Sequence, residues 1–165
     1  MAATIRVKSN VKSIQKRLND VFRKFPNITR KGLGQAGFQL IDIIRTLTSK
    51  QQDFRRRKFA PYSDSYLEQL QKEGKPTAVD LFYSGDMLGS LTTKVHSSRK
   101  ASVFFNRSAE AKKAVFNQVI GNPKREFFGF DKRTEKIIQK SFIKFVEKEI
   151  RKFNVWAIEK ISLII

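Results

Sequence analysis

Few side chains of this sequence have a type and spacing suited to catalysis. His96 is the one histidine and there is no cysteine, so neither a histidine pair nor a thiolate is available to hold a metal. Ser84 is followed directly by Gly85, whereas a nucleophile elbow has glycines two residues to either side of its serine. Asp80 and Asp86 could form a carboxylate pair, but Asp86 also fits the first turn of a short helix. The sequence therefore predicts no enzyme, no cofactor and no metal site.

A different chemistry, the binding of polyanions, is favoured by the charge. The chain has 165 residues, with 34 Lys and Arg against 15 Asp and Glu, a formal net charge of +19 and a pI near 10.4. The excess is uneven: residues 1–58 carry 15 basic and 3 acidic side chains, residues 59–97 carry 3 and 5, and residues 98–165 carry 16 and 7. Such a surface attracts phosphates through salt-dependent contacts but does not select a base sequence.

The densest basic run is "FRRRKF", residues 54–59, in a loop expected at residues 49–62. Its arginines could contact phosphates while its rings stack on bases. The alternatives are a solvated loop and a loop that meets an acidic protein partner. No helix-turn-helix, zinc-finger or RRM signature is present to provide specific readout. The candidate contacts to DNA or to a neighbouring subunit are Arg55, Arg56, Arg57, Lys58, Lys124 and Arg125.

The elements that must position these residues are expected to form one α+β domain over residues 1–165. "LTTKVHS" and "ASVFFN" are rich in β-branched and aromatic residues and predict an antiparallel hairpin at about 91–105. "ATIRVKS", near the N-terminus, alternates weakly and predicts a short first strand. We expect this small antiparallel sheet to pack against N-terminal helices and a long C-terminal amphipathic helix.

Two N-terminal helices are predicted from apolar residues at three- and four-residue intervals. The first begins near Ser13 and is expected to end at Pro26, and the second covers about residues 29–47. Glycines lower helix propensity by about 1 kcal/mol each relative to alanine, so those in the second helix predict close packing against another backbone or a later helix start. These glycines are Gly32, Gly34 and Gly37.

Capping residues mark the remaining helices. A short helix should begin at Ser63 or Asp64 and end at Gly74. A second short helix should end at Gly121, and Asp131 can cap the long C-terminal helix.

The chain ends in an apolar tail, residues 155–165, which a monomer would struggle to hide. We expect this tail to form a subunit interface. The first ten residues lack the apolar core of a signal peptide, and no stretch approaches the roughly 20 apolar residues that span a bilayer. The sequence therefore predicts a soluble protein made in the cytoplasm, with no membrane contact. The candidate interface residues are Trp156, Ile161, Leu163, Ile164 and Ile165.

Three segments, in this order, resemble one known family: "KFAPYSDSYLEQLQKEGK" (58–75), "DLFYSGDMLGSLT" (80–92) and "VIGNPKREFFGFD" (119–131). The virion-morphogenesis proteins of tailed bacteriophages, also called tail-completion or head–tail neck proteins, look similar. They have an aromatic-x-Pro-x-Ser segment before a helix, a Ser/Thr-Gly-x-Leu-x-x-Ser-Leu segment, and a Pro-x-Arg-x-Phe-x-Gly loop before the last helix. The matching positions are Phe59, Pro61, Ser63, Ser84, Gly85, Leu88, Gly121, Pro123, Arg125, Phe127, Phe128 and Gly129.

The resemblance implies a structural virion protein without turnover. Several copies would form a ring, expected to be a hexamer, that closes the tail or joins it to the head around the DNA channel. The implied partners are other neck proteins, portal or adaptor proteins, tail-tube proteins and, through non-specific contacts, packaged DNA. The implied location is the neck of the virion, reached from the host cytoplasm. The alternative from another class is a basic accessory protein that binds nucleic acid without sequence preference.

Overall fold

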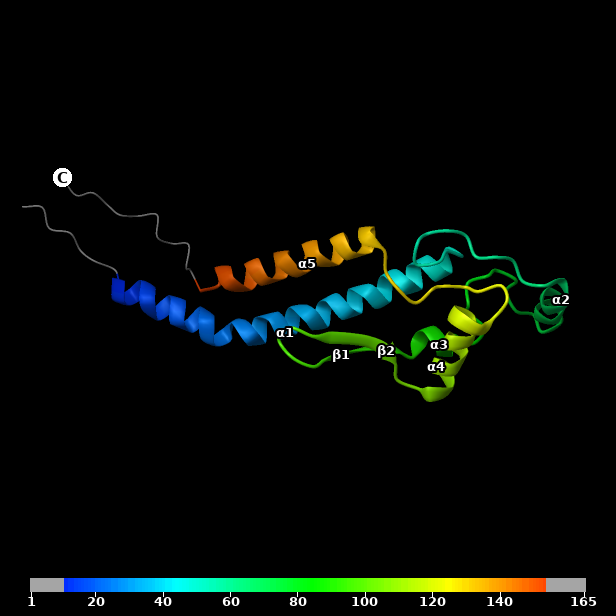
Figure 1. Cartoon of the computed structure of the whole chain (residues 1–165), viewed down its shortest axis with the longest axis horizontal. Coiled ribbons are helices and arrows are strands. Elements are labelled where there is room, and N and C mark those ends of the chain that lie inside the picture. Colours follow the sequence, from blue (N-terminus) through cyan, green and yellow to red (C-terminus); the bar gives the residue numbers. More distant parts are fainter. Residues whose placement is uncertain (1–10, 154–165) are drawn as a thin grey trace, which may run out of the picture.

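A computed structural model describes residues 11–153 of the chain. The molecule is elongated, and α1 (Val11–Ser49) runs through most of its length (Figure 1). None of the helices in this part of the chain is long and apolar enough to cross a bilayer. The α+β class predicted from the sequence is confirmed. The other elements are α2 (Asp64–Lys72), α3 (Asp86–Gly89), β1 (Leu91–Val95), β2 (Ala101–Phe105), α4 (Ser108–Val115), the π-helical η1 (Phe116–Ile120) and α5 (Lys132–Arg151).

The helix end predicted at Pro26 is wrong, because α1 continues through this proline to Ser49. Proline removes one helical donor and crowds the preceding turn, at a cost of about 3 kcal/mol in a helix interior. The Thr29 hydroxyl donates to the carbonyls of Phe25 (3.2 Å) and Pro26 (3.0 Å). Ile28 and Thr29 are buried directly after the proline. The burial of these two side chains offsets the cost of the proline. The sequence around Pro26 does not reveal this burial.

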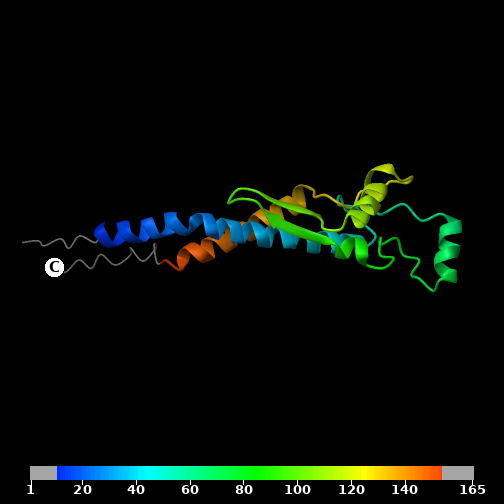
Figure 2. The ribbon, with the colours of Figure 1, turned by 90° about the horizontal axis from the view of Figure 1, so that it is seen from below.

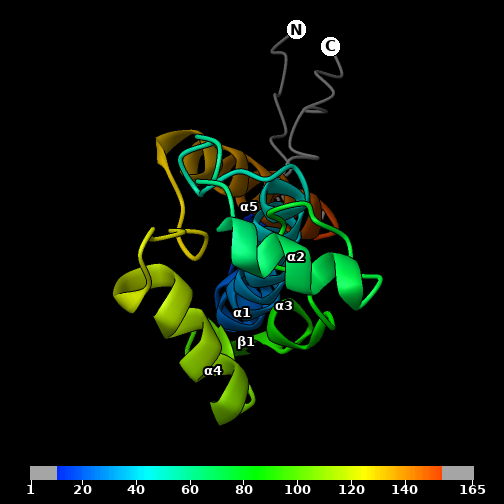
Figure 3. The same ribbon diagram turned by 90° about the vertical axis from the view of Figure 1, so that its right-hand side faces the viewer.

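α1 forms the central layer of the molecule. The β1–β2 hairpin lies on one side of α1 and α5 on the other (Figure 1), as the view along the helix also shows (Figure 3). Figure 2 shows the same elongated molecule from below. A Cβ atom at Gly32 would lie 2.8 Å from the Phe142 ring of α5, and one at Gly37 would lie 2.8 Å from the Thr93 Cβ of β1. The predicted packing against another backbone is wrong, because side chains of α5 and β1 fill the space at Gly32 and Gly37. The alternative of a later helix start is also wrong, since α1 is continuous through these glycines.

The predicted hairpin is confirmed. β1 and β2 pair antiparallel, with Leu91 opposite Phe105 and Val95 opposite Ala101. Side chains alternate across a strand, so these four residues share the face that covers α1, and Leu91 is buried there. The first strand predicted near the N-terminus, on residues 3–9, lies outside the described residues.

The predicted helix ends are confirmed. Ser63 occupies the N-cap position of α2, although its side chain makes no capping hydrogen bond, and the chain leaves that helix through Gly74 at a φ of 63°. Asp131 caps α5, its Oδ1 accepting from the Thr134 N–H at 2.8 Å. Gly121 follows η1, as expected. The predicted interface residues of the apolar tail lie outside the described residues: Trp156, Ile161, Leu163, Ile164 and Ile165.

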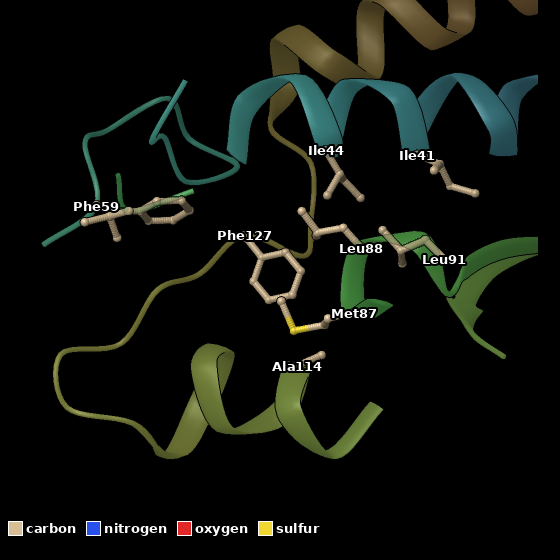
Figure 4. Packing of buried hydrophobic residues seen from close by; sticks show 9 residues of the cluster. Ile41, Ile44, Phe59, Met87, Leu88, Leu91, Ala114 and Phe127 are labelled. Carbon is tan, nitrogen blue, oxygen red and sulfur yellow. The ribbon is translucent and has the colours of Figure 1, made fainter. Parts of the chain in front are cut away.

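The main core lies near the C-terminal end of α1 (Figure 4). Its most buried members, Ile44 and Phe127, are each 1% exposed. Full burial of such a side chain contributes about 1.5–3 kcal/mol, so this cluster holds together segments that are far apart in the chain. Its members are Ile41, Ile44, Phe59, Val79, Met87, Leu88, Leu91, Ala114 and Phe127.

Candidate functional site

The three segments that carry the family resemblance meet in the core. Phe59, Leu88 and Phe127 come from residues 58–75, 80–92 and 119–131, and all three belong to the same buried cluster (Figure 4). They enter it from the loop after α1, from α3 and from the segment before α5. The segments therefore form one structural unit.

The polar residues around Ser84 serve the start of α3. Gly85 has a φ of 80°, a conformation that favours glycine, and is the N-cap of the helix. The Ser84 hydroxyl donates to the Asp86 carboxylate at 2.6 Å, and Arg107 Nη2 donates to the same carboxylate at 3.0 Å. These two hydrogen bonds lower the pKa of Asp86. The arrangement is architectural, because these contacts tie the start of α3 to Arg107, which precedes α4.

Arg125 links the first segment to the third. Its Nη2 donates to the carbonyls of Ala60 (3.4 Å) and Pro61 (3.0 Å), and its guanidinium lies 4.8 Å from the centre of the Tyr62 ring. Arg125 and Lys124 were both predicted as contacts to DNA or a subunit. The structure gives Arg125 these intrachain partners and leaves the Lys124 side chain exposed.

Packing and hydrogen bonds with the side-chain amide of Gln118 hold the rest of the third segment in place. The Phe128 N–H donates to Gln118 Oε1 at 3.0 Å, and the Phe128 carbonyl accepts from Gln118 Nε2 at 3.1 Å. A Cβ atom at Gly129 would lie 3.0 Å from the Phe54 ring, and Gly121 is buried. The remaining motif residues line a cleft between the segments: Ser63, Ser84, Gly85 and Pro123.

This cleft has a volume of about 510 Å³ and mixes aromatic rings with charge. Glu110 in its wall is buried, with Oε1 bound to Lys113 Nζ at 3.0 Å and Oε2 lacking a hydrogen-bond partner among the described residues. Burial raises the pKa of the Tyr62 hydroxyl. A carboxylate beside aromatic rings suits the binding of a cationic group rather than a covalent reaction. The rings are Tyr62, Tyr66, Phe82, Tyr83 and Phe116.

The basic run after α1, which we call the arginine loop (residues 53–58), is organised around Asp53. This carboxylate is buried, and its Oδ1 accepts from the N–H groups of Arg55 and Arg57, each at 2.8 Å. Its Oδ2 accepts from Arg57 Nε at 2.8 Å. Arg56, between them, has a φ of 65°. The loop therefore has a defined hydrogen-bonded turn, unlike the solvated loop that was one alternative.

Outside that turn, the other two arginines bind carboxylates far along the chain. Arg55 pairs with Glu126, and Arg56 pairs with Asp131 and donates to the Thr134 hydroxyl at 3.0 Å. Burial would raise the pKa of Asp131, but the hydrogen bonds from Arg56 and Thr134 and the Arg56 charge outweigh it and hold the pKa well below its ordinary value. Contact of these arginines with DNA or an acidic subunit stays a prediction. Their intrachain partners reduce the charge that they offer to an outside ligand.

The groups considered for catalysis do not converge. Among residues 11–153, no cluster of three or more His, Asp or Glu side chains could hold a metal ion. Asp80 accepts from the Phe82 N–H at 2.9 Å, so it has a partner different from those of Asp86. His96 Nε2 lies 3.0 Å from Ser102 Oγ, on exposed surface beside the turn that joins β1 to β2.

Sequence reasoning missed a regular set of basic residues on α5. Six lysines recur at every fourth position, and all six side chains are exposed. The signal was visible in the sequence, but only the apolar positions of this helix were used to predict it. We call this set the lysine row: Lys132, Lys136, Lys140, Lys144, Lys148 and Lys152.

Comparison with known proteins identifies no relative. No family model, no curated protein and no solved structure matches this chain. The resemblance to phage neck proteins therefore rests on the three segments alone and stays a prediction.

Proposed function

We propose that the chain is a structural subunit of the head–tail neck of a tailed bacteriophage, where several copies form a ring around the DNA channel. The observation that carries this proposal is the meeting of the three segments in one core, through Phe59, Leu88 and Phe127. Packing in one core accounts for the presence of all three segments without a catalytic role for any of them. A structural protein, which acts through its shape rather than through a reaction, is expected to have such a core.

An exposed apolar face supports an oligomer. Val115, Phe116, Val119 and Ile120 of α4 and η1 are each at least 48% exposed. Residues at these spacings lie on one side of a helix, so together they form a patch rather than scattered contacts. A closed ring buries such a patch against a different surface of the next copy. The net charge of +19 is also suited to a channel through which DNA passes.

The ring can be tested with the purified chain. Light scattering and electron microscopy should find a ring, expected to be a hexamer. Val119→Asp should break it, because a charge would be placed in the subunit contact. Ile143→Asp is the matched control, since Ile143 lies on α5 and is 54% exposed against 55% for Val119. Monomers alone at all concentrations, or equal effects of the two substitutions, would count against the proposal.

A second function, a basic accessory protein that binds nucleic acid outside the virion, is favoured by the exposed lysines of α5. Mass spectrometry of purified virions separates the two functions. A neck subunit should be present in a few copies per particle beside portal and tail-tube proteins. An accessory protein should be found in the infected cell and be absent from the particle.

A further inference from the structure

The lysine row crosses the exposed side of α5 from end to end. Each step of four residues advances about 6 Å along the helix and turns about 40°, so the row extends for about 30 Å. The partly buried residues of α5, such as Phe142 and Phe145, face α1, where their rings lie against Gly32. Over its five steps the row turns by about 200°, so its middle members, Lys136, Lys140 and Lys144, lie on the side opposite α1, while the two ends of the row lie toward its flanks.

Most of the charge in the row is uncompensated. Lys152 is paired with Glu149. The hydrogen bond from Lys152 lowers the pKa of Glu149, and Lys148 contributes to the positive field that lowers it further. The side chains of five of the lysines form no ion pair or hydrogen bond within the described part of the chain: Lys132, Lys136, Lys140, Lys144 and Lys148. An exposed ammonium group without a carboxylate partner is available to neutralise a phosphate, and the release of the cations condensed on the DNA then drives non-specific binding.

We propose that the lysine row is a phosphate-binding surface for double-stranded DNA. Its middle members, Lys136, Lys140 and Lys144, span about 12 Å and about 80° of the helix surface, so they can contact neighbouring phosphates of one duplex together. The inference adds to the proposed neck function the surface of each subunit that contacts DNA. It rests on the proposed function only in placing this contact in the virion.

The surroundings of the row favour a duplex over other polyanions. Single strands are bound by stacking bases on aromatic rings, and the two rings of α5, Phe142 and Phe145, pack on α1 instead. A helix that binds a membrane inserts a continuous apolar face into the lipid, whereas the aromatic face of α5 packs on α1 and its exposed apolar side chains, Ile137 and Ile143, are interspersed with lysines. A surface of this kind, with charge in excess of apolar groups, is suited to the phosphates on the outside of a double helix.

The test is fluorescence anisotropy of the full chain with a 30-base-pair duplex over a range of salt concentrations. The row variant is Lys136→Gln/Lys140→Gln/Lys144→Gln. The control variant, Lys72→Gln/Lys94→Gln/Lys112→Gln, removes the same charge from exposed lysines of α2, β1 and α4. At about 50 mM salt, the row variant should bind at least tenfold more weakly, and its log–log salt slope should fall by about 2.7, or about 0.9 for each phosphate that is no longer neutralised. The control should change less than about threefold.

Several results would overturn the proposal. These are equal losses of affinity in the two variants, absence of duplex binding by the unchanged protein at low salt, or stronger binding to single strands or to phosphatidylserine vesicles. Replacing the same three lysines by arginine should retain the affinity. Light scattering on the same samples tests the ring separately from this inference. If the row variant still forms rings, the proposed neck function stands whatever happens to DNA binding. If the protein is monomeric but binds DNA through the row, the inference stands and the proposed ring is wrong.

Discussion

The arginine loop and the lysine row are both strongly basic, but they hold their charge in different ways. In the loop, three consecutive arginines bind Asp53, Glu126 and Asp131 of the same chain. In the row, five of six lysines have no such partner among the described residues. Arg56 is also half-buried, whereas every lysine of the row is exposed. The loop uses its charge to fix the fold, and the row presents its charge to solvent.

The comparison teaches that the density of charge in a sequence is a poor measure of the charge available for binding. A guanidinium with several directed donors is suited to partly buried carboxylates, while a lysine holds a compact, well-hydrated charge at the end of a flexible chain. Removing a loop arginine should therefore affect stability, and removing a row lysine should affect binding. Four predictions test this division, from the largest expected change in stability to the smallest.

The largest effect is expected for Asp53→Ala. The N–H groups of Arg55 and Arg57 and the Arg57 guanidinium would lose their acceptor, at a cost of about 2–3 kcal/mol in the free energy of unfolding. Chemical denaturation measures this. Asp42→Ala, at an exposed position on α1, is the control and should change stability by less than about 0.5 kcal/mol. Equal effects would show that the loop is not held as described.

A smaller loss is expected for Arg56→Gln. This change removes the hydrogen bonds to Asp131 and Thr134, which should cost about 1.5–2 kcal/mol because one of these groups is charged and both are half-buried or buried. Lys140→Gln, from the lysine row, should cost less than about 0.5 kcal/mol in the same denaturation experiment. If the two variants were equally stable, the distinction between loop and row would fail.

The effect of Asp131→Asn should depend on pH. The pKa of this carboxyl is depressed in the folded chain, so its contribution to stability is fully present above the unfolded pKa of about 3.9 and is lost as the pH falls below it. At pH 7 we expect a loss of about 1 kcal/mol, since asparagine can still cap the helix but carries no charge. Urea denaturation at several pH values should show the two proteins converging below about pH 4. A difference that stays constant with pH would contradict the assignment.

The smallest change is expected for the triple substitution of the row, Lys136→Gln/Lys140→Gln/Lys144→Gln. Like charges four residues apart on a helix destabilise it slightly, so stability should rise by no more than about 0.5 kcal/mol. The gain should shrink with added salt, which screens the repulsion between exposed lysines. Thermal unfolding at low and high salt measures both effects. A large loss of stability would mean that the row has a structural role.

Local signals in the sequence predicted much of the fold. Ser63 and Gly74 marked the ends of α2, Asp131 marked the start of α5, and β-branched residues marked the hairpin. Each of these signals acts within a few residues of its own position. The helix end predicted at Pro26 was wrong because burial of Ile28 and Thr29 offsets the cost of the proline. That burial depends on residues far along the chain.

The site was harder to predict because its contacts are distant in sequence. Arg55 and Glu126 are 71 residues apart, and Arg56 and Asp131 are 75 residues apart, so no pattern near the loop revealed these pairs. The lysine row was different, since its four-residue period can be read directly. It was missed because the spacing in α5 was examined for apolar residues alone. Charged residues at helical spacing merit the same attention.

The length of α1 also has a mechanical consequence. The helix has 39 residues and is therefore about 58 Å long. Its two members of the main core, Ile41 and Ile44, lie in its last quarter. The first part of the helix is thus a lever arm of about 45–50 Å, along which α5 runs (Figure 1). A neighbouring protein that displaces the start of this arm by about 5 Å would rotate the helix by about 6° about the core. The rotation would act at once on the three segments that meet there, residues 58–75, 80–92 and 119–131.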